Sequence, residues 1–83
     1  MLKLLANESR LLILCQLAAA GEMSVGNLTD AVGLSQSALS QHLARLRAEN
    51  LVATRREAQT IHYRIADPRV GRVLNLLKSL YCP

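Results

Sequence analysis

The residues best suited to chemistry in this chain are hydrogen-bonding side chains that fall at helical spacing between residues 34 and 47. With Leu39 as the reference, Leu43 and Leu46 fall on the same side of such a helix. The opposite side carries small or polar uncharged residues, namely Ser37, Ser40, Gln41, Ala44 and Ala48. Hydroxyl and amide groups can bind base edges, and small side chains let a backbone come close to them. The pattern predicts a helix whose outer face lies in a groove of DNA.

Candidate DNA contacts lie on this helix and on the basic segment that follows it. The N-terminal half of a recognition helix enters the groove first, so its polar residues are expected to read bases. The arginines are expected to contact phosphates or the minor groove instead. A helix whose polar face meets only water is the alternative, although such a face usually carries Glu and Lys. The candidate set is Ser35, Gln36, Ser37, Ser40, Gln41, Arg45, Arg55, Arg56, Gln59 and Arg64.

Positive charge is concentrated in one part of the chain. The 83 residues carry a net charge of +4, and most arginines lie between Arg45 and Arg64. A local basic patch favours a polyanionic partner. Aromatic residues make up only 2% of the chain, so the stacking platforms of single-strand binders are missing. Double-stranded DNA is therefore the predicted partner, and no membrane contact is expected.

Cys15 and Cys82 are the remaining reactive side chains. Free cysteine is among the most buried residue types, so packing is the simplest interpretation of Cys15. Cys82 falls off the apolar stripe of its helix and near Lys78, which would favour its thiolate. Two such thiols in a reducing compartment indicate a reversible redox sensor. Neither pairs with His42 or His62 at zinc-finger spacing, so no metal site and no cofactor are predicted.

Cap residues and apolar periodicity divide the chain into helices. The predicted helices begin at the caps Asn7, Ser24, Ser35 and Asp67, and the first three end near Gly21, Gly33 and Asn50. The apolar run 11–20 imitates a signal peptide, but Glu8 stands in its supposed basic region and Gln16 interrupts it. A cytoplasmic protein is therefore expected. The stripe predicted for the last helix consists of Val70, Val73, Leu74, Leu77, Leu80 and Tyr81.

A period of two replaces helical periodicity after Leu51. The alternating runs are Val52 to Arg56 and Thr60 to Ile65, which predict a β-hairpin. Its tip, Glu57-Ala58-Gln59, lacks Gly and Asn, so a loop longer than two residues is expected there.

Together these elements predict a mainly α domain with a β-hairpin. The short helices around Gly33-Leu34-Ser35 form a helix-turn-helix, and a basic hairpin directly after it makes a winged helix. The predicted order is α-α-α-α-β-β-α, with the first helix largely missing. Residues 1–83 form a single domain, in which 24–50 are the helix-turn-helix, 51–66 the wing and 67–83 a last helix.

Three segments resemble the arsenic-repressor (ArsR) family of bacterial transcriptional repressors. They are the run LKLLANESRLLIL at 2–14, the run SQSALSQHLARLR at 35–47, and the hairpin from Arg55-Arg56 to Tyr63. The resemblance covers nearly the whole chain. It implies a cytoplasmic homodimer on a palindromic operator, with the last helix and a helix before residue 8 forming the dimer interface.

Members of this family sense different inducers, and the resemblance tells which sites this chain retains. The arsenic branch has cysteines where this chain reads Glu22 to Leu28, and the zinc branch has histidines in the last helix, where this chain has none. The pair Cys15 and Cys82 resembles the thiol-based branch, in which two cysteines meet across the first core helix and the last helix. The resemblance therefore implies a repressor switched by oxidation or persulfidation of this pair, with a reactive sulfur species or an oxidant as inducer.

Two alternatives stay open, and a third function class is not expected. A metal-responsive repressor of the same fold would need other ligands, and a winged helix used only for protein association would not bind duplex DNA. An enzyme is not expected, because no nucleophile, base and orienting group occur together.

Overall fold

Four helices and three strands follow one another in the described part of the chain. The computed structural model describes the backbone of residues 7–81 and the side chains of residues 7–76. The elements are α2 (Glu8–Ala20), β1 (Met23–Ser24), α3 (Val25–Val32), α4 (Gln36–Ala48), β2 (Val52–Glu57), β3 (Thr60–Ile65) and α5 (Pro68–Tyr81). The tail of an earlier helix predicted for residues 1–6 lies outside the described residues.

Side-chain caps begin the first three helices as predicted. The side-chain oxygens of Asn7, Ser24 and Ser35 each accept a hydrogen bond from the backbone N–H three residues further on, at 3.1 to 3.2 Å. Such a bond satisfies an amide that has no partner within the helix. Gly21 and Gly33 end α2 and α3 with φ angles of +84° and +70°, which glycine adopts without strain. The helix boundaries read from these caps are confirmed.

Asp67 begins α5. Its carboxylate accepts from the backbone N–H of Arg69 at 2.9 Å and forms an ion pair with the Arg69 side chain. Val70 and Leu74 are buried one turn apart, so the predicted stripe is confirmed over the side chains that the structure describes. Its other members, Leu77, Leu80 and Tyr81, lie beyond those side chains.

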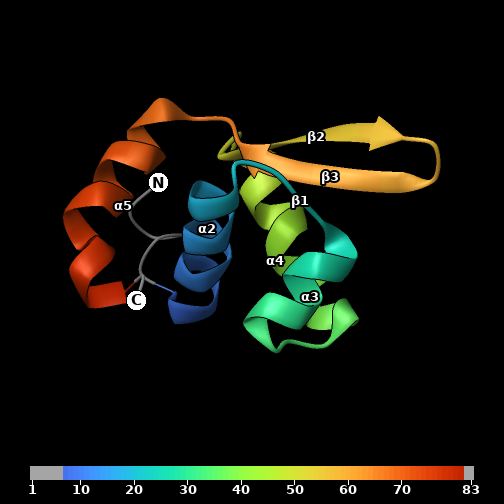
Figure 1. The fold of residues 1–83 in the computed structure, drawn as a ribbon, viewed down its shortest axis with the longest axis horizontal. Coiled ribbons are helices and arrows are strands. Elements are labelled where there is room, and N and C mark those ends of the chain that lie inside the picture. Colours follow the sequence, from blue (N-terminus) through green and yellow to red (C-terminus); the bar gives the residue numbers. More distant parts are fainter. Residues whose placement is uncertain (1–6, 82–83) are drawn as a thin grey trace.

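Helix α2 is the centre of the fold. It lies between α5 on one side and α3 with α4 on the other, and it also contacts β3 (Figure 1). The core is made of leucine, isoleucine and valine together with Cys15, and the chain has no Phe or Trp. Its largest contribution comes from α2, which buries Leu11, Ile13, Leu14, Cys15 and Leu17. None of the described helices combines the length and apolar character that a membrane span requires.

The sheet has three antiparallel strands in the order β1-β3-β2. The hairpin β2-β3 was predicted, whereas β1, a strand of two residues before α3, was not. In the observed register Thr54 lies opposite Tyr63, and Arg55 lies opposite His62. Successive side chains alternate between faces, so Thr54 and Tyr63 share the face that packs on the helices. Arg55 and His62 share the opposite face. The two strands extend beyond the helices as a projecting wing (Figure 1).

The prediction of a long hairpin loop is wrong. Glu57 pairs with Thr60, so only Ala58 and Gln59 form the turn, and Ala58 has a φ of +54°. A two-residue turn matches the twist of the strands and requires positive φ, which an alanine adopts only at a cost. Six facing pairs and the neighbouring β1 fix the register here, and this pairing overrides the preference of the turn residues.

Candidate nucleic-acid interface

The outer face of α4 is uncharged and exposed. Leu39, Leu43 and Leu46 are almost fully buried, with at most 1% of each side chain accessible. The residues predicted to face outward are all exposed, namely Gln36, Ser37, Ser40, Gln41, Ala44 and Ala48. The hydroxyl of Ser35 is engaged in capping the helix, which orients the first turn of α4. The predicted inner and outer faces of this helix are therefore confirmed.

Two hollows flank α4 and leave it standing as a ridge. One, of about 480 Å³, lies toward α3 and the sheet and is lined by Val25, Ser40, Leu43, Ala44, Arg47, Ala48 and Tyr63. The other, of about 520 Å³, lies toward α2 and is lined by Arg10, Gln41, His42, Ala44, Arg45 and Ala48. Ala44 and Ala48 border both hollows, so the crest of the ridge carries methyl groups only. A protruding helix with small side chains on its crest can enter a major groove closely.

Arg10 and His42 connect α2 to α4 beside this ridge. Arg10 Nε donates a hydrogen bond to His42 Nδ1 at 3.2 Å. Burial lowers the pKa of His42 from its ordinary value, and the positive charge of Arg10 lowers this pKa further. The imidazole is therefore held neutral, with Nδ1 as acceptor and the proton on Nε2. His42 thus forms a contact that positions Arg10 beside α4.

Arg55 on the wing is held by two carboxylates. Its Nη2 and Nε groups donate to Glu22, with Nη2 at 2.6 Å from Oε1, and its Nη1 donates to Glu57 Oε2 at 2.9 Å. The hydrogen bonds from Arg55 are the main cause of the lowered pKa values of Glu22 and Glu57. Sequence reasoning missed Glu22, because its closeness to the wing depends on β1. A strand of two residues shows no period in the sequence, so no local signal could have found this contact.

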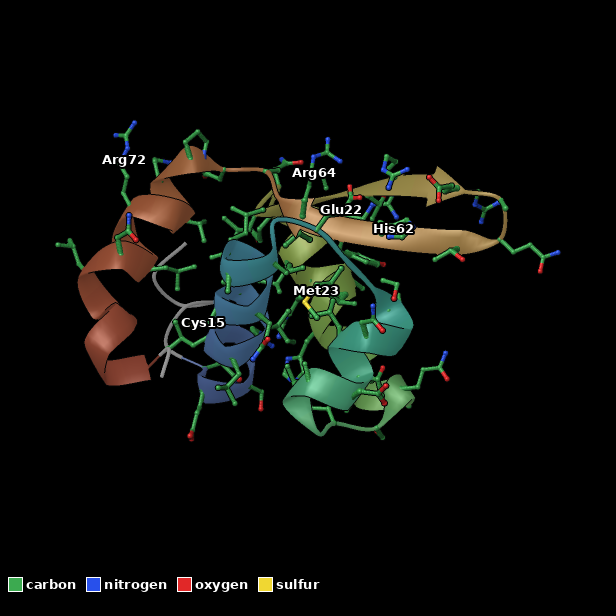
Figure 2. The ribbon with its side chains drawn as sticks, in the orientation of Figure 1. Cys15, Glu22, Met23, His62, Arg64 and Arg72 are labelled. Carbon is green, nitrogen blue, oxygen red and sulfur yellow. The ribbon has the colours of Figure 1, made fainter. Side chains whose placement is uncertain are left out.

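The other predicted contacts on the wing and beside α4 are exposed, namely Arg45, Arg56, Gln59 and Arg64. Arg56 follows Arg55 and therefore lies on the opposite face of β2, the face shared with Tyr63. Arg64 points away from α2 and α4 (Figure 2). The structure thus places the predicted arginines on both faces of the wing instead of gathering them on one.

Cys15 lies in the core on the side of α2 toward α5 (Figure 2). Only 7% of its surface is accessible. Cys82, its predicted partner, lies outside the described residues, so the pairing stays a prediction. Within the described part of the chain, no group of three or more His, Cys, Asp or Glu residues could hold a metal ion.

Residues 7–54 match the protein family described as bacterial regulatory protein, arsR family. The chain belongs to the arsR family. The matched region runs from the cap of α2 into the wing and includes the whole helix-turn-helix. The family resemblance read from the sequence is therefore confirmed.

Individual relatives agree with the family assignment. The transcriptional activator HlyU of Vibrio cholerae is 54% identical over 99% of this chain and 75% of that protein. The nodulation protein NolR of Rhizobium meliloti is 55% identical over 96% of this chain and 65% of that protein. A solved structure of V. cholerae HlyU superposes with a TM-score of 0.90, covering 99% of this chain and 88% of that chain.

A more distant relative preserves the same architecture. The structure of the repressor BigR from Xylella fastidiosa is 38% identical, covers 99% of this chain and 83% of that chain, and has a TM-score of 0.88. HlyU is a transcriptional activator and BigR a transcriptional repressor, and their structures share the winged-helix fold of this chain. This arsR-family chain is accordingly a DNA-binding regulator with a winged helix-turn-helix fold, and not an enzyme.

Proposed function

We propose that this arsR-family chain is a cytoplasmic homodimeric repressor that reads a palindromic operator with the outer face of α4. The observation that carries the proposal is the ridge of α4, with an uncharged crest and exposed polar residues in its N-terminal half. In this reading residues 24–50 are the helix-turn-helix, 51–66 the wing and 67–83 the dimerisation helix. The base-reading residues are Gln36, Ser37, Ser40 and Gln41, and Arg45, Arg56 and Gln59 bind the backbone.

Single substitutions of the polar residues beside the crest of α4 test the reading of bases. Replacing Gln41 or Ser40 by Ala should weaken binding to the operator, selected from random duplexes, by about 1 to 3 kcal/mol. Binding to random duplex should change much less, because base contacts are absent there. Asn75→Ala removes an exposed amide on α5, away from the ridge, and serves as the matched control. Equal losses on both duplexes would show that these side chains only position the protein.

We further propose that Cys15 and Cys82 switch the affinity for the operator. The position of Cys15 in the contact between α2 and α5 supports this proposal, as do the thiol-branch resemblance and a structure of the HlyU relative that is described as reduced. An oxidant such as peroxide would accept two electrons and two protons from the two thiols, leaving a disulfide. Two equivalents of a persulfide would instead leave a trisulfide: one outer sulfur accepts the two electrons and leaves as hydrogen sulfide, the other stays in the bridge, and two thiols are released. Tying the last helix to α2 would alter the angle between the two recognition helices of the dimer.

The switch is tested by measuring operator affinity after treatment with reductant, peroxide or persulfide. Intact mass spectrometry should verify the product in each sample. A coupling of about 1 to 3 kcal/mol should make the oxidised or persulfidated protein bind the operator more weakly. Cys15→Ser and Cys82→Ser should bind equally after every treatment. Unchanged affinity in protein with a verified bridge would refute the switch, and loss of binding on added zinc alone would favour a metal-responsive repressor.

A further inference from the structure

We infer that Arg55 is a positioning residue that fastens the wing to the body of the protein through Glu22, and that the wing presents its opposite face, with Arg56, to DNA. This inference rests on the proposed function, in which the wing contacts the DNA backbone. It separates two neighbouring arginines that the sequence alone treated as equivalent.

The guanidinium of Arg55 is occupied on two sides. Its Nε and Nη2 atoms donate to the carboxylate oxygens of Glu22, with donor–acceptor distances between 2.6 and 3.3 Å. Its Nη1 atom donates to Glu57 Oε2 at 2.9 Å. A fork of this kind fixes the orientation of the guanidinium as well as its position. Each of the three guanidinium nitrogens therefore already donates to a carboxylate, and the negative charge of these carboxylates opposes the approach of a phosphate.

The contact between Arg55 and Glu22 spans the whole sheet. Glu22 directly precedes β1, Arg55 lies on β2, and β3 runs between these two strands. The strand β1 pairs with β3 through only two residue pairs, Met23 with Tyr63 and Ser24 with His62. The wing is therefore joined to the segment before α3 by a short strand pairing and by this ion pair, which links the two edge strands.

Charge also separates the two faces of the wing. The contacts with Arg55 keep the pKa values of both carboxyl groups below their ordinary range, so Glu22, Arg55 and Glu57 together carry one net negative charge at neutral pH. Arg64 lies on the same face, where its positive charge also lowers the pKa of Glu22, so the charges of this face cancel and offer a phosphate no net attraction. Arg56 forms no ion pair with any other described residue, and it shares its face with Tyr63, which lines the hollow beside α4. The wing face nearer the recognition helix thus keeps its positive charge available.

Salt dependence of DNA binding distinguishes the two arginines. With a mixed-sequence duplex as the probe, Arg56→Ala should lower the slope of log affinity against log salt by about 1, because one phosphate contact is lost. Arg55→Ala should leave that slope unchanged and weaken binding about two- to fivefold at every salt concentration, as expected for a lost exposed ion pair. A slope lowered by about 1 in Arg55→Ala would overturn the inference.

Substitution of Glu22 gives opposite results under the two roles of Arg55. If Arg55 positions the wing, Glu22→Gln should weaken binding by a similar factor; if Arg55 binds phosphate, freeing it should strengthen binding. Glu8→Gln removes an exposed carboxylate on α2 and corrects for the change in net charge. The exchanged pair Glu22→Arg with Arg55→Glu should regain part of the lost affinity, because the ion pair between these two positions returns while Glu57 then faces a second carboxylate. Stronger binding by Glu22→Gln than by Glu8→Gln, or no rescue by the exchanged pair, would contradict the positioning role.

Hydrogen exchange tests the fastening without DNA. Amides of β2 and β3 should exchange faster in Glu22→Gln and in Arg55→Ala, and more slowly in the exchanged pair than in either single variant. If the wild type shows no salt-dependent binding to duplex DNA, the proposed function fails, and exchange alone then decides whether the ion pair holds the wing. Unchanged exchange in both single variants would reject the fastening itself.

Discussion

Arg10 and His42 show how a side chain beside the recognition helix depends on its neighbours. His42 accepts from Arg10 Nε, and both line the hollow that also contains Arg45. Protonating His42 would remove the acceptor and place a second positive charge against Arg10. Burial is the largest cause of the lowered pKa of His42, and the positive charge of Arg10 lowers this pKa further. The pair therefore holds together while His42 is neutral.

This arrangement predicts a pH dependence of stability. Because the pKa of His42 in the folded protein lies below its ordinary value of 6.5, the unfolded chain binds more protons in the interval between the two values. The contribution to the free energy of unfolding is present above pH 6.5 and is lost as the pH falls through the folded pKa. Urea unfolding over a pH series should show this loss in the wild type and not in His42→Gln, which keeps a neutral acceptor. Parallel pH profiles for the two proteins would contradict the prediction.

Individual contacts were predictable where they depend on local spacing. The inner and outer residues of α4 follow from helical periodicity, and the caps follow from a hydroxyl or amide placed before an apolar run. The contact of Arg55 with Glu22 joins residues 33 positions apart and depends on the strand order, so no local pattern announces it. The exposure of an arginine on the wing could be predicted from the sequence. The binding of its guanidinium to two carboxylates could not.

At the scale of elements, the hairpin turn is where local preference and sheet pairing disagree. Ala58 has a φ of +54°, whereas Gln59, the other turn residue, is not among the described residues with positive φ. An L-residue in the left-handed region costs about 1 to 2 kcal/mol, and a glycine avoids this cost. Glycine also makes the unfolded chain more flexible, which lowers the free energy of unfolding by about 0.5 to 1 kcal/mol. Ala58→Gly should therefore raise the free energy of unfolding by about 0.5 to 1 kcal/mol, measured by urea unfolding.

Gln59→Gly is the matched control for this prediction. It introduces the same residue one position later, where no positive φ has to be relieved, and should lower stability or leave it unchanged. An equal gain in both variants would show that glycine acts on the unfolded chain and not on the turn.

The strand β1 marks the limit of prediction at this scale. Two residues cannot show a period, and Met23 and Ser24 carry no strand signal of their own. Their extended backbone is set by β3, which offers a free edge beside them, and by Ser24, which must remain non-helical to cap α3. Elements with several turns or several alternating pairs, such as α2, α4 and the hairpin, were predictable because each carries its own pattern.

At the scale of the whole molecule, α2 connects the DNA-reading unit to α5. It contacts both α5 and α3, and its leucines fill the core between them (Figure 1). A core closely packed with branched side chains transmits a displacement instead of absorbing it. This arrangement supports the proposal that a bridge from Cys15 to the last helix would reach the recognition helices.

The exposed face of α5 leads to a prediction about assembly. Leu76 has 82% of its surface accessible, and it is the only large apolar residue among the described side chains that is so exposed. In the proposed homodimer this leucine meets the partner subunit, where its burial would stabilise the dimer by about 1.5 to 3 kcal/mol. Leu76→Glu would bury a charge there and should shift the dimer to monomer in sedimentation experiments, with weaker binding to a palindromic operator. The monomer should keep the wild-type helix content, because Leu76 does not contribute to the described core.

Asn75→Glu adds the same charge at the neighbouring exposed position, on a different side of α5, and should stay dimeric. If Leu76→Glu sediments as the wild type does, this face of α5 is not the dimer interface, and the two recognition helices must be spaced by another contact.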